Sequence, residues 1–452
     1  MAISRIRVAS AALALFAGLG WPSSSWAQQE VEVTGPPSEI IGNVYTSAIL
    51  GTLGSIQLFL PSINQALVAE GFPPVTLNPD RLALDLAQDV ATAFVLTSSI
   101  GNELSTFPLG SSAGGFSWTF DPSLGVFNRA SDSFGPLFAD RALTLGEGRF
   151  SAGVNFQRAT FDTFQGKGLD DGEIQFYSEV VPDIVGLGTS FVRTENTLNL
   201  KLSTTTVGLF ANYGATDRLD VGVAVPIVSV KLDAGLHQRL ALFDGTPLYD
   251  TVFRGRAGAT GLGDLTLRGK YRFFDVPGGG LAAAVDLRLP TGNEHDFLGI
   301  PATQTEVFLI GSAAYGRVAP HVNVGYTFSS ANDLVDPDGF GETAFLLEPP
   351  AEFNLAGGVD VSVVPKVTVA GDVLIRTLRN TARLVESTSE VGPGFQEFRT
   401  AFPTNVTVSY GSLGVKLNTW GDTLLTGNVL FPLNRNGLQD SLMLTVGIDV
   451  SF

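Results

Sequence analysis

The chain ends in the stretch LMLTVGIDVSF, residues Leu442 to Phe452. Every even position of this stretch is apolar, and the odd positions carry Met443 followed by Thr, Gly, Asp and Ser. Side chains of a β-strand point alternately to opposite faces, so this period of two predicts a strand with one fully apolar face. Phe452 places an aromatic ring at the very end of that face.

The same alternation recurs upstream, and it predicts a transmembrane antiparallel β-barrel of about twelve strands. Long connections alternate with short ones, and the short ones contain turn residues such as Gly214-Ala215-Thr216-Asp217. This pattern is typical of outer-membrane barrels, with the short turns and Phe452 on the periplasmic side. The strands are expected at 149–164, 196–214, 218–232, 261–274, 281–290, 303–315, 320–329, 352–363, 367–378, 404–417, 423–433 and 441–452.

Two irregularities in this pattern need an interpretation. Two strands exchange their apolar face midway, around Ser203–Thr206 and around Pro226–Val228, and we interpret both places as β-bulges. A possible hairpin over 116–120 and 125–128 would raise the strand count to fourteen.

Almost every charge of the expected strands lies on the face opposite to the apolar one. In a barrel the apolar face meets lipid and the polar face lines the lumen. These charges either form rings that select solutes or pair across strands and hold a plug, and we favour the structural role. The predicted lumen-lining residues are Asp264, Arg268, Lys270, Arg272, Asp286, Arg288, Glu306, His321, Glu352, Asp360, Asp372 and Arg376.

The composition restricts the possible functions. Among 452 residues there is no Cys, there are three His, and the formal net charge is −17. The missing Cys excludes disulfides and thiolate metal sites, and the acidic balance leaves no basic face for a nucleic acid. We therefore expect no cofactor, no metal and no nucleic-acid partner.

The first 27 residues are expected to be a secretory signal peptide. Arg5 and Arg7 precede an apolar stretch over 8–20, and Ser25-Trp26-Ala27 forms a small-x-small cleavage site. Export and the barrel pattern together predict a location in the outer membrane. The expected partners there are membrane lipid, lipopolysaccharide and the barrel assembly machinery, which would recognise Phe452.

Residues 28–148 do not follow the barrel repeat. The stretches 49–70 and 81–99 have partly helical patterns, and a Gly/Ser-rich bend and the possible hairpin follow. A barrel of twelve to fourteen strands encloses a lumen wide enough to leak unless something fills it. We interpret this region as a plug, with a periplasmic or partly ordered appendage as the alternative.

Two motifs suggest catalysis only superficially. Gly110-Ser111-Ser112-Ala113-Gly114 has the spacing of a nucleophile elbow, which requires a strand before it and a helix after it. The flanking pattern offers neither. Glu294-His295-Asp296 falls in a predicted outer loop, where an exposed polar role is the simpler reading. We therefore expect no enzyme.

Several Gly-rich pieces resemble one family of membrane proteins. They are Phe107 to Phe116, Ser133-Phe134-Gly135-Pro136, Gly261 to Leu265, Arg268 to Phe273, and Leu289-Pro290-Thr291-Gly292. The chain resembles the meta-pathway phenol degradation family of outer-membrane proteins, which is related to fatty-acid transport barrels. The Asn-Pro-Ala start of typical fatty-acid transporters is absent. The resemblance implies transport of small hydrophobic or aromatic molecules.

The leading hypothesis is therefore a passive, plug-gated outer-membrane channel for small hydrophobic or aromatic compounds. A general diffusion porin and a structural barrel without transport are the alternatives. A lumen without the plug would favour the porin, and a sealed lumen would favour the structural barrel.

Overall fold

The computed structural model describes residues 29–69, 74, 93, 96–108, 110, 115–121, 126–129, 131–181, 192–242, 247–276, 278–330, 349–388 and 396–452. The expected signal peptide over 1–27, the helical pattern over 81–92 and residues 111–114 of the elbow-like motif lie outside the described residues.

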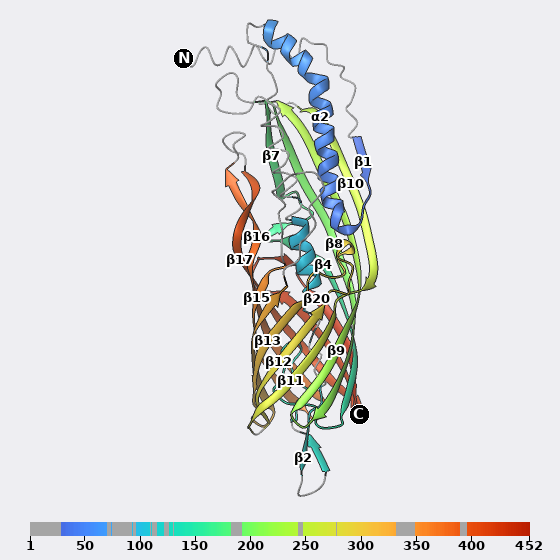
Figure 1. The fold of residues 1–452 in the computed structure, drawn as a ribbon, viewed down its shortest axis with the longest axis vertical. Helices are drawn as coiled ribbons and strands as arrows, with labels where there is room; N and C mark the ends of the chain where they lie inside the picture. The colour runs from blue at the N-terminus through green and yellow to red at the C-terminus, as the bar shows by residue number, and fades with distance from the viewer. Residues whose placement is uncertain are drawn as a thin grey trace.

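Twelve antiparallel strands close into a barrel, as predicted from the sequence (Figure 1). Each barrel strand pairs with the next along the chain, and the first pairs with the last between Ser151–Arg158 and Leu444–Ser451. Closure leaves no free strand edge within the bilayer. The twelve strands are β4 (Phe150–Phe161), β8 (Val192–Thr216), β9 (Leu219–Leu242), β11 (Leu265–Val276), β12 (Gly279–Leu289), β13 (Gln304–Ser312), β14 (Val318–Ser329), β15 (Ala351–Val364), β16 (Val367–Thr388), β17 (Gln396–Trp420), β18 (Thr423–Pro432) and β20 (Met443–Ser451).

The fourteen-strand alternative is wrong. The expected hairpin exists as β2 (Trp118–Asp121) and β3 (Val126–Arg129), but these strands pair only with each other. Figure 1 shows this hairpin projecting beyond the barrel at the end where the chain terminates. Because β20 pairs directly with β4, the barrel closes without it.

The outer face of the barrel is apolar and its inner face is charged. Leu267, Val307 and Leu444 each expose more than 40% of their surface on the outside, whereas Lys270 and Asp372 are buried on the inside. A closed barrel with this distribution of side chains belongs in the outer membrane.

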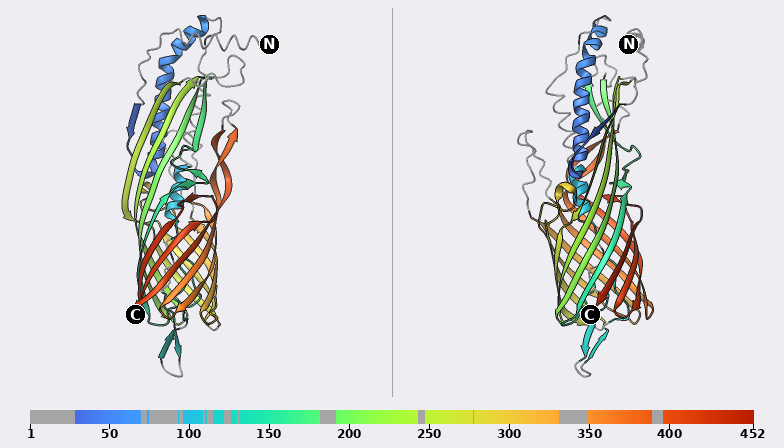
Figure 2. Two further views of the ribbon diagram at one scale, coloured as in Figure 1. Left: turned by 180° about the vertical axis from the view of Figure 1, so that it is seen from behind. Right: turned by 90° about the vertical axis from the view of Figure 1, so that its right-hand side faces the viewer.

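Seven strands extend the sheet far beyond the barrel at the end opposite to Phe452 (Figures 1 and 2). β8 has 25 residues, whereas about 9–11 are enough to cross a bilayer. β8, β9, β16 and β17 extend out of the barrel, and β10 (Pro247–Leu262) adds to β9. β7 (Ile174–Val181) pairs with β8, and β1 (Gln29–Val33) runs parallel to β10. Two of the connections predicted as loops, 233–260 and 379–403, are therefore largely strand in the residues that the structure describes.

The two predicted bulges are absent. The β8–β9 register continues from Ser203↔Lys231 through Thr206↔Val228 without a shift. The apolar face changes because the surroundings change. Inside the bilayer the outward side chains, such as Leu209, meet lipid, whereas beyond it the inward side chains, such as Leu200 and Leu232, form an apolar core.

The helix α2 (Pro37–Ala69) fills the concave side of the extended sheet. Its residues Ile40, Ile41 and Val44 are fully buried in the same core as Leu200 and Phe253. Its stretch Pro37–Ser62 is long and apolar enough to cross a membrane. The part of this stretch around Ile40, Ile41 and Val44 packs on β9 and β10, whereas Leu50 and Leu58 are exposed.

Short elements lie at the outer mouth of the barrel. β5 (Thr163–Phe164), β6 (Lys167–Gly168) and β19 (Leu438–Gln439) form a small sheet, and η1 (Glu294–Asp296) is a single helical turn. A further helix occupies 96–105.

Candidate functional site

Residues 131–145 lie across the lumen and are held by side chains of the barrel wall. Asp372 on β16 accepts hydrogen bonds from the backbone nitrogens of Leu137 at 2.9 Å and Phe138 at 2.8 Å. Asn323 on β14 accepts from the Asp140 nitrogen at 2.7 Å and donates to its carbonyl oxygen at 3.1 Å. These side chains satisfy backbone groups of a segment that has no regular secondary structure of its own.

A buried charge cluster anchors the same segment. Arg141 forms an ion pair with Asp360 on β15 and donates to the Ser133 carbonyl oxygen at 3.1 Å. His321 on β14 stands between two carboxylates, with Nε2 2.8 Å from Asp372 and Nδ1 3.4 Å from Asp360. The four charged or titratable side chains are all less than 10% exposed. Removing one partner of such a cluster leaves a buried charge without compensation.

Side chains of further strands also bind residues 131–145. Lys270 on β11 donates to the Leu143 carbonyl oxygen at 2.8 Å, and Asp220 on β9 accepts from the Leu145 nitrogen at 3.1 Å. Lys416 on β17 donates to the Phe134 carbonyl oxygen at 3.3 Å. Ser312 on β13 accepts from the Ala142 nitrogen at 3.0 Å. The anchoring side chains thus come from β9, β11, β13, β14, β15, β16 and β17, which surround much of the lumen.

An aromatic cluster lies at the periplasmic side of this segment. Phe116, Phe134 and Leu424 are buried together, and the Arg129 guanidinium lies 4.9 Å and 4.8 Å from the centres of the two phenyl rings. Cations over aromatic faces are attracted by the ring quadrupole. Arg129 therefore ties the base of the β2–β3 hairpin to the segment inside the barrel.

The helix over 96–105 lies at the opposite, outer mouth and has fewer attachments. Glu103 accepts from the Leu438 nitrogen at 2.6 Å, and burial raises the pKa of this carboxyl to about 7. Arg376 on β16 donates to the Thr106 hydroxyl at 2.7 Å, and Arg288 on β12 donates to the Ser105 carbonyl oxygen at 3.3 Å. The last turn of the helix is therefore held by two arginines of the wall.

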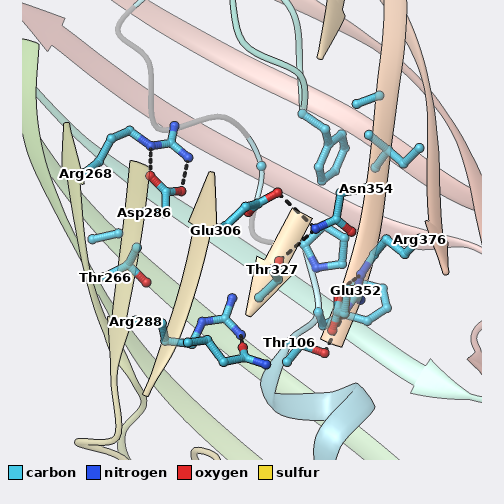
Figure 3. Close-up of a pocket in the computed structure, with 18 of the residues that line it drawn as sticks. Thr106, Thr266, Arg268, Asp286, Arg288, Glu306, Thr327, Glu352, Asn354 and Arg376 are labelled. Atoms are coloured by element: carbon cyan, nitrogen blue, oxygen red, sulfur yellow. Dashed lines mark hydrogen bonds and ion pairs between the residues drawn. The ribbon is translucent and has the colours of Figure 1, made fainter. Parts of the chain in front are cut away.

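A cavity of about 260 Å³ remains between the outer and inner segments (Figure 3). Apolar and aromatic side chains line part of it, and charged and amide side chains line the rest. The apolar lining includes Phe107, Phe138, Phe210 and Leu374, and the polar lining includes Arg268, Asp286, Arg288, Gln304, Glu306, Thr327, Glu352, Asn354 and Arg376.

Two of the three arginines around the cavity are neutralised by carboxylates, as Figure 3 shows. Arg268 bonds Asp286 at 2.7 Å and also reaches Asp140 at 2.7 Å, and Arg376 pairs with Glu352 at 2.8 Å. These pairs satisfy charges that would be costly to bury alone. They also fix the shape of the polar wall.

The structure brings most of the predicted lumen-lining residues together. Arg268, Asp286, Arg288, Glu306, Glu352 and Arg376 line the cavity, and Lys270, His321, Asp360 and Asp372 contact residues 131–145 or the charge cluster beside them. Asp264 instead accepts from the Gly292 and Ile300 nitrogens of an outer loop, and Arg272 pairs with Asp275 beside a periplasmic turn.

The sequence pattern did not indicate the partners on the inner segment. Asp140 and Arg141 lie where no strand period assigns a direction to a side chain. Asp220 and Asn354 do lie on the lumenal face of their strands, so the alternation could have identified them.

The motif Glu294-His295-Asp296 forms the turn η1 on the surface. Its His295 side chain is 57% exposed, and its Nε2 lies 3.9 Å from Glu294. Across the described ranges of the chain, no group of three or more His, Asp or Glu side chains is arranged to hold a metal ion.

Comparison with known proteins gives structural likenesses only. No family model and no curated protein match the chain, so the family resemblance of its Gly-rich pieces stays a prediction. An outer-membrane channel from Pseudomonas putida F1 is similar at 15% identity and a TM-score of 0.43, over 68% of this chain and 97% of that one. A FadL homologue from Pseudomonas aeruginosa is similar at 12% identity and a TM-score of 0.30, over 67% and 89%. The monoaromatic hydrocarbon channel CymD is similar at 9% identity and a TM-score of 0.30, over 68% and 89%. The assignment of the fold rests on the strand pairing of this chain itself.

Proposed function

We propose that this barrel is a passive outer-membrane channel for small hydrophobic or aromatic compounds, gated by the chain segments inside its lumen. The observation that carries the proposal is the cavity between residues 96–108 and 131–145. A barrel that served only as a structural element would not need a cavity with both aromatic and charged walls.

The size and lining of the cavity suit a small aromatic guest. Sites for drug-sized ligands measure about 300–1,000 Å³. At about 260 Å³ this cavity is below that range, which favours a molecule with one or two rings. Phe107, Phe138 and Phe210 offer ring faces and edges, against which an aromatic guest packs favourably.

The attachments of the two segments suggest which one opens. Residues 131–145 are bound by side chains of seven strands. The last turn of the 96–105 helix has polar contacts only to Arg288, Arg376 and Leu438 among the bonds of the described residues, while Leu96 and Ile100 of the same helix pack in the apolar core. Mobile gates are drawn from the less stable parts of a structure. We therefore expect the outer segment to move first and to admit the guest.

Uptake into proteoliposomes with a lipopolysaccharide outer leaflet tests this proposal. The account expects the protein to accelerate entry of radiolabelled phenol but not of arabinose. A general diffusion porin would pass both solutes, and a structural barrel would pass neither.

A variant that fills the cavity connects the uptake to this site. Ala356 lines the cavity, and Ala356→Phe should reduce phenol uptake by occupying part of its volume. Ala283 lies on β12 between the buried residues Ala282 and Ala284 and so faces lipid, which makes Ala283→Phe the matched control. Equal uptake by both variants would show that the route bypasses the cavity.

We also propose that Phe452 is the signal read by the barrel assembly machinery. Its ring is 65% exposed and stacks on Phe150 at 6.2 Å, while its backbone nitrogen donates to the Phe150 carbonyl oxygen at 2.8 Å. It therefore lies at the seam where the first and last strands meet. Lipid and lipopolysaccharide would surround the exposed apolar belt.

A further inference from the structure

Arg288 differs from the other arginines of the cavity. Arg268 and Arg376 each have a carboxylate within 3 Å. Arg288 donates from Nη1 to the Gln304 side chain at 3.2 Å and to the Ser105 carbonyl oxygen at 3.3 Å, both neutral acceptors. Within the described ranges, no carboxylate lies in ion-pair distance of its guanidinium, which is only partly buried at the cavity wall.

An arginine without a paired carboxylate can bind an anion, and Asp264 acts on Arg288 only from beyond ion-pair distance. The guanidinium carries five N–H donors in a planar fork that matches the two oxygens of a carboxylate. Charge-assisted, bidentate bonds of this kind are stronger than the bonds to neutral oxygens that Arg288 makes here. The phenyl rings that line the cavity cannot pair with the carboxylate, but they can pack against an apolar group that carries it.

We propose that the guest of this cavity is a small aromatic monocarboxylic acid, with its carboxylate on Arg288 and its ring against Phe107, Phe138 and Phe210. This inference rests on the proposed channel function and specifies its substrate class. Arg288 is then the residue that determines specificity.

Glu306 restricts the guest further. It faces the same cavity from β13, lies opposite Asp286 in the strand register, and accepts a hydrogen bond from Asn354 at 2.9 Å. A second carboxylate on the guest would come close to these two acids and be repelled. The site therefore favours a monoacid over a diacid of similar size.

The same contact connects binding to gating. Arg288 holds the Ser105 carbonyl oxygen at the end of the 96–105 helix, while Arg376 holds Thr106 beside it. A carboxylate that takes over the donors of Arg288 removes one of these two attachments. The guest thus loosens the segment that covers its own cavity.

Calorimetric binding to the purified full-length protein in detergent tests the assignment. The probes are benzoate and benzamide, which have similar shape and differ in charge. Benzoate should bind the wild type at least about tenfold more tightly, as expected for a hydrogen bond to a charged group. Arg288→Met should weaken benzoate about 10- to 100-fold and change benzamide less than about threefold. Arg288→Lys, which keeps the charge without the fork, should fall between wild type and Arg288→Met.

Matched controls separate this site from general effects. Arg272→Met removes an arginine of the same barrel outside the cavity and should leave benzoate binding unchanged. Phthalate, a diacid, and inorganic phosphate, which has no ring, should each bind at least about tenfold more weakly than benzoate. Phosphate binding as tight as benzoate would overturn the assignment to an aromatic acid.

The outcomes distinguish this inference from the channel proposal. If benzamide binds as tightly as benzoate and Arg288→Met changes neither, the acid specificity is wrong and a channel for neutral aromatic compounds stands. If neither benzoate nor benzamide binds the wild-type protein, the cavity is not an aromatic site and the proposed function fails with it.

Discussion

Replacing Asp372 by Ala should release residues 131–145 from the barrel wall. One carboxylate oxygen accepts from the Leu137 and Phe138 nitrogens at 2.9 Å and 2.8 Å, and the other pairs with His321 at 2.8 Å. Hydrogen bonds to a charged group contribute about 1.5–3 kcal/mol each, and breaking a buried pair costs about 3–5 kcal/mol. Because these effects overlap, we expect a local loss of about 3–5 kcal/mol.

Hydrogen exchange measured by mass spectrometry on peptides within 131–145 reports this loss directly. A tenfold change corresponds to about 1.4 kcal/mol, so exchange of the Leu137 and Phe138 amides should accelerate roughly 100-fold to several thousandfold. Asp233→Ala serves as the control, because Asp233 pairs with Arg256 in the exposed outer extension. Unchanged protection at Leu137 and Phe138 in Asp372→Ala would refute the role assigned to this carboxylate.

Three further perturbations test other parts of the structure. The folded pKa of Glu103 is raised from 4.5 to about 7, so docking of the 96–105 helix should be strongest below pH 4.5 and weaken as pH rises through 7. At about 1.36 kcal/mol per pKa unit, the loss of docking free energy approaches about 3 kcal/mol. Glu103→Gln should abolish this pH dependence, measured as hydrogen exchange of the helix amides. A pH dependence that persists in Glu103→Gln would contradict the assignment to Glu103. A Cβ at Gly115 would overlap Leu424, so Gly115→Ala should destabilise the protein by about 1–3 kcal/mol and lower its Tm, whereas an unchanged Tm would show that this contact is loose. Phe452→Ala should reduce the yield of folded barrel in membranes, Phe452→Tyr should largely preserve it, and equal yields from both would exclude an aromatic signal.

The barrel was predictable because its strands carry a period of two in a two-sided environment. Lipid selects apolar side chains such as Leu267 and Val307 on one face, and the lumen admits charges such as Arg268 on the other. The same reasoning wrongly predicted bulges at Ser203–Thr206 and Pro226–Val228. There the surroundings of each strand face change, but the strand register does not. Periodicity reports which face is apolar and cannot say whether lipid or a helix covers it.

The interior of the barrel was only partly predictable. The alternation placed Arg268, Arg288 and Arg376 at the lumen, but it could not show that Arg288 alone of these three has no carboxylate partner in the described chain. The pairing of Arg268 with Asp286 follows from the β11–β12 register, but its second partner, Asp140, lies in a segment without regular secondary structure. Contacts of this kind are set by tertiary packing.

Single-channel conductance in planar bilayers tests most directly whether the inner segments close the barrel. We would compare the mature protein with variants that lack residues 29–108 and residues 29–145. The account predicts that the mature protein is nearly closed, that removal of 29–108 leaves most of the block in place, and that removal of 29–145 opens a stable pore. A mature protein that already conducts as well as the barrel without residues 29–145 would contradict the account.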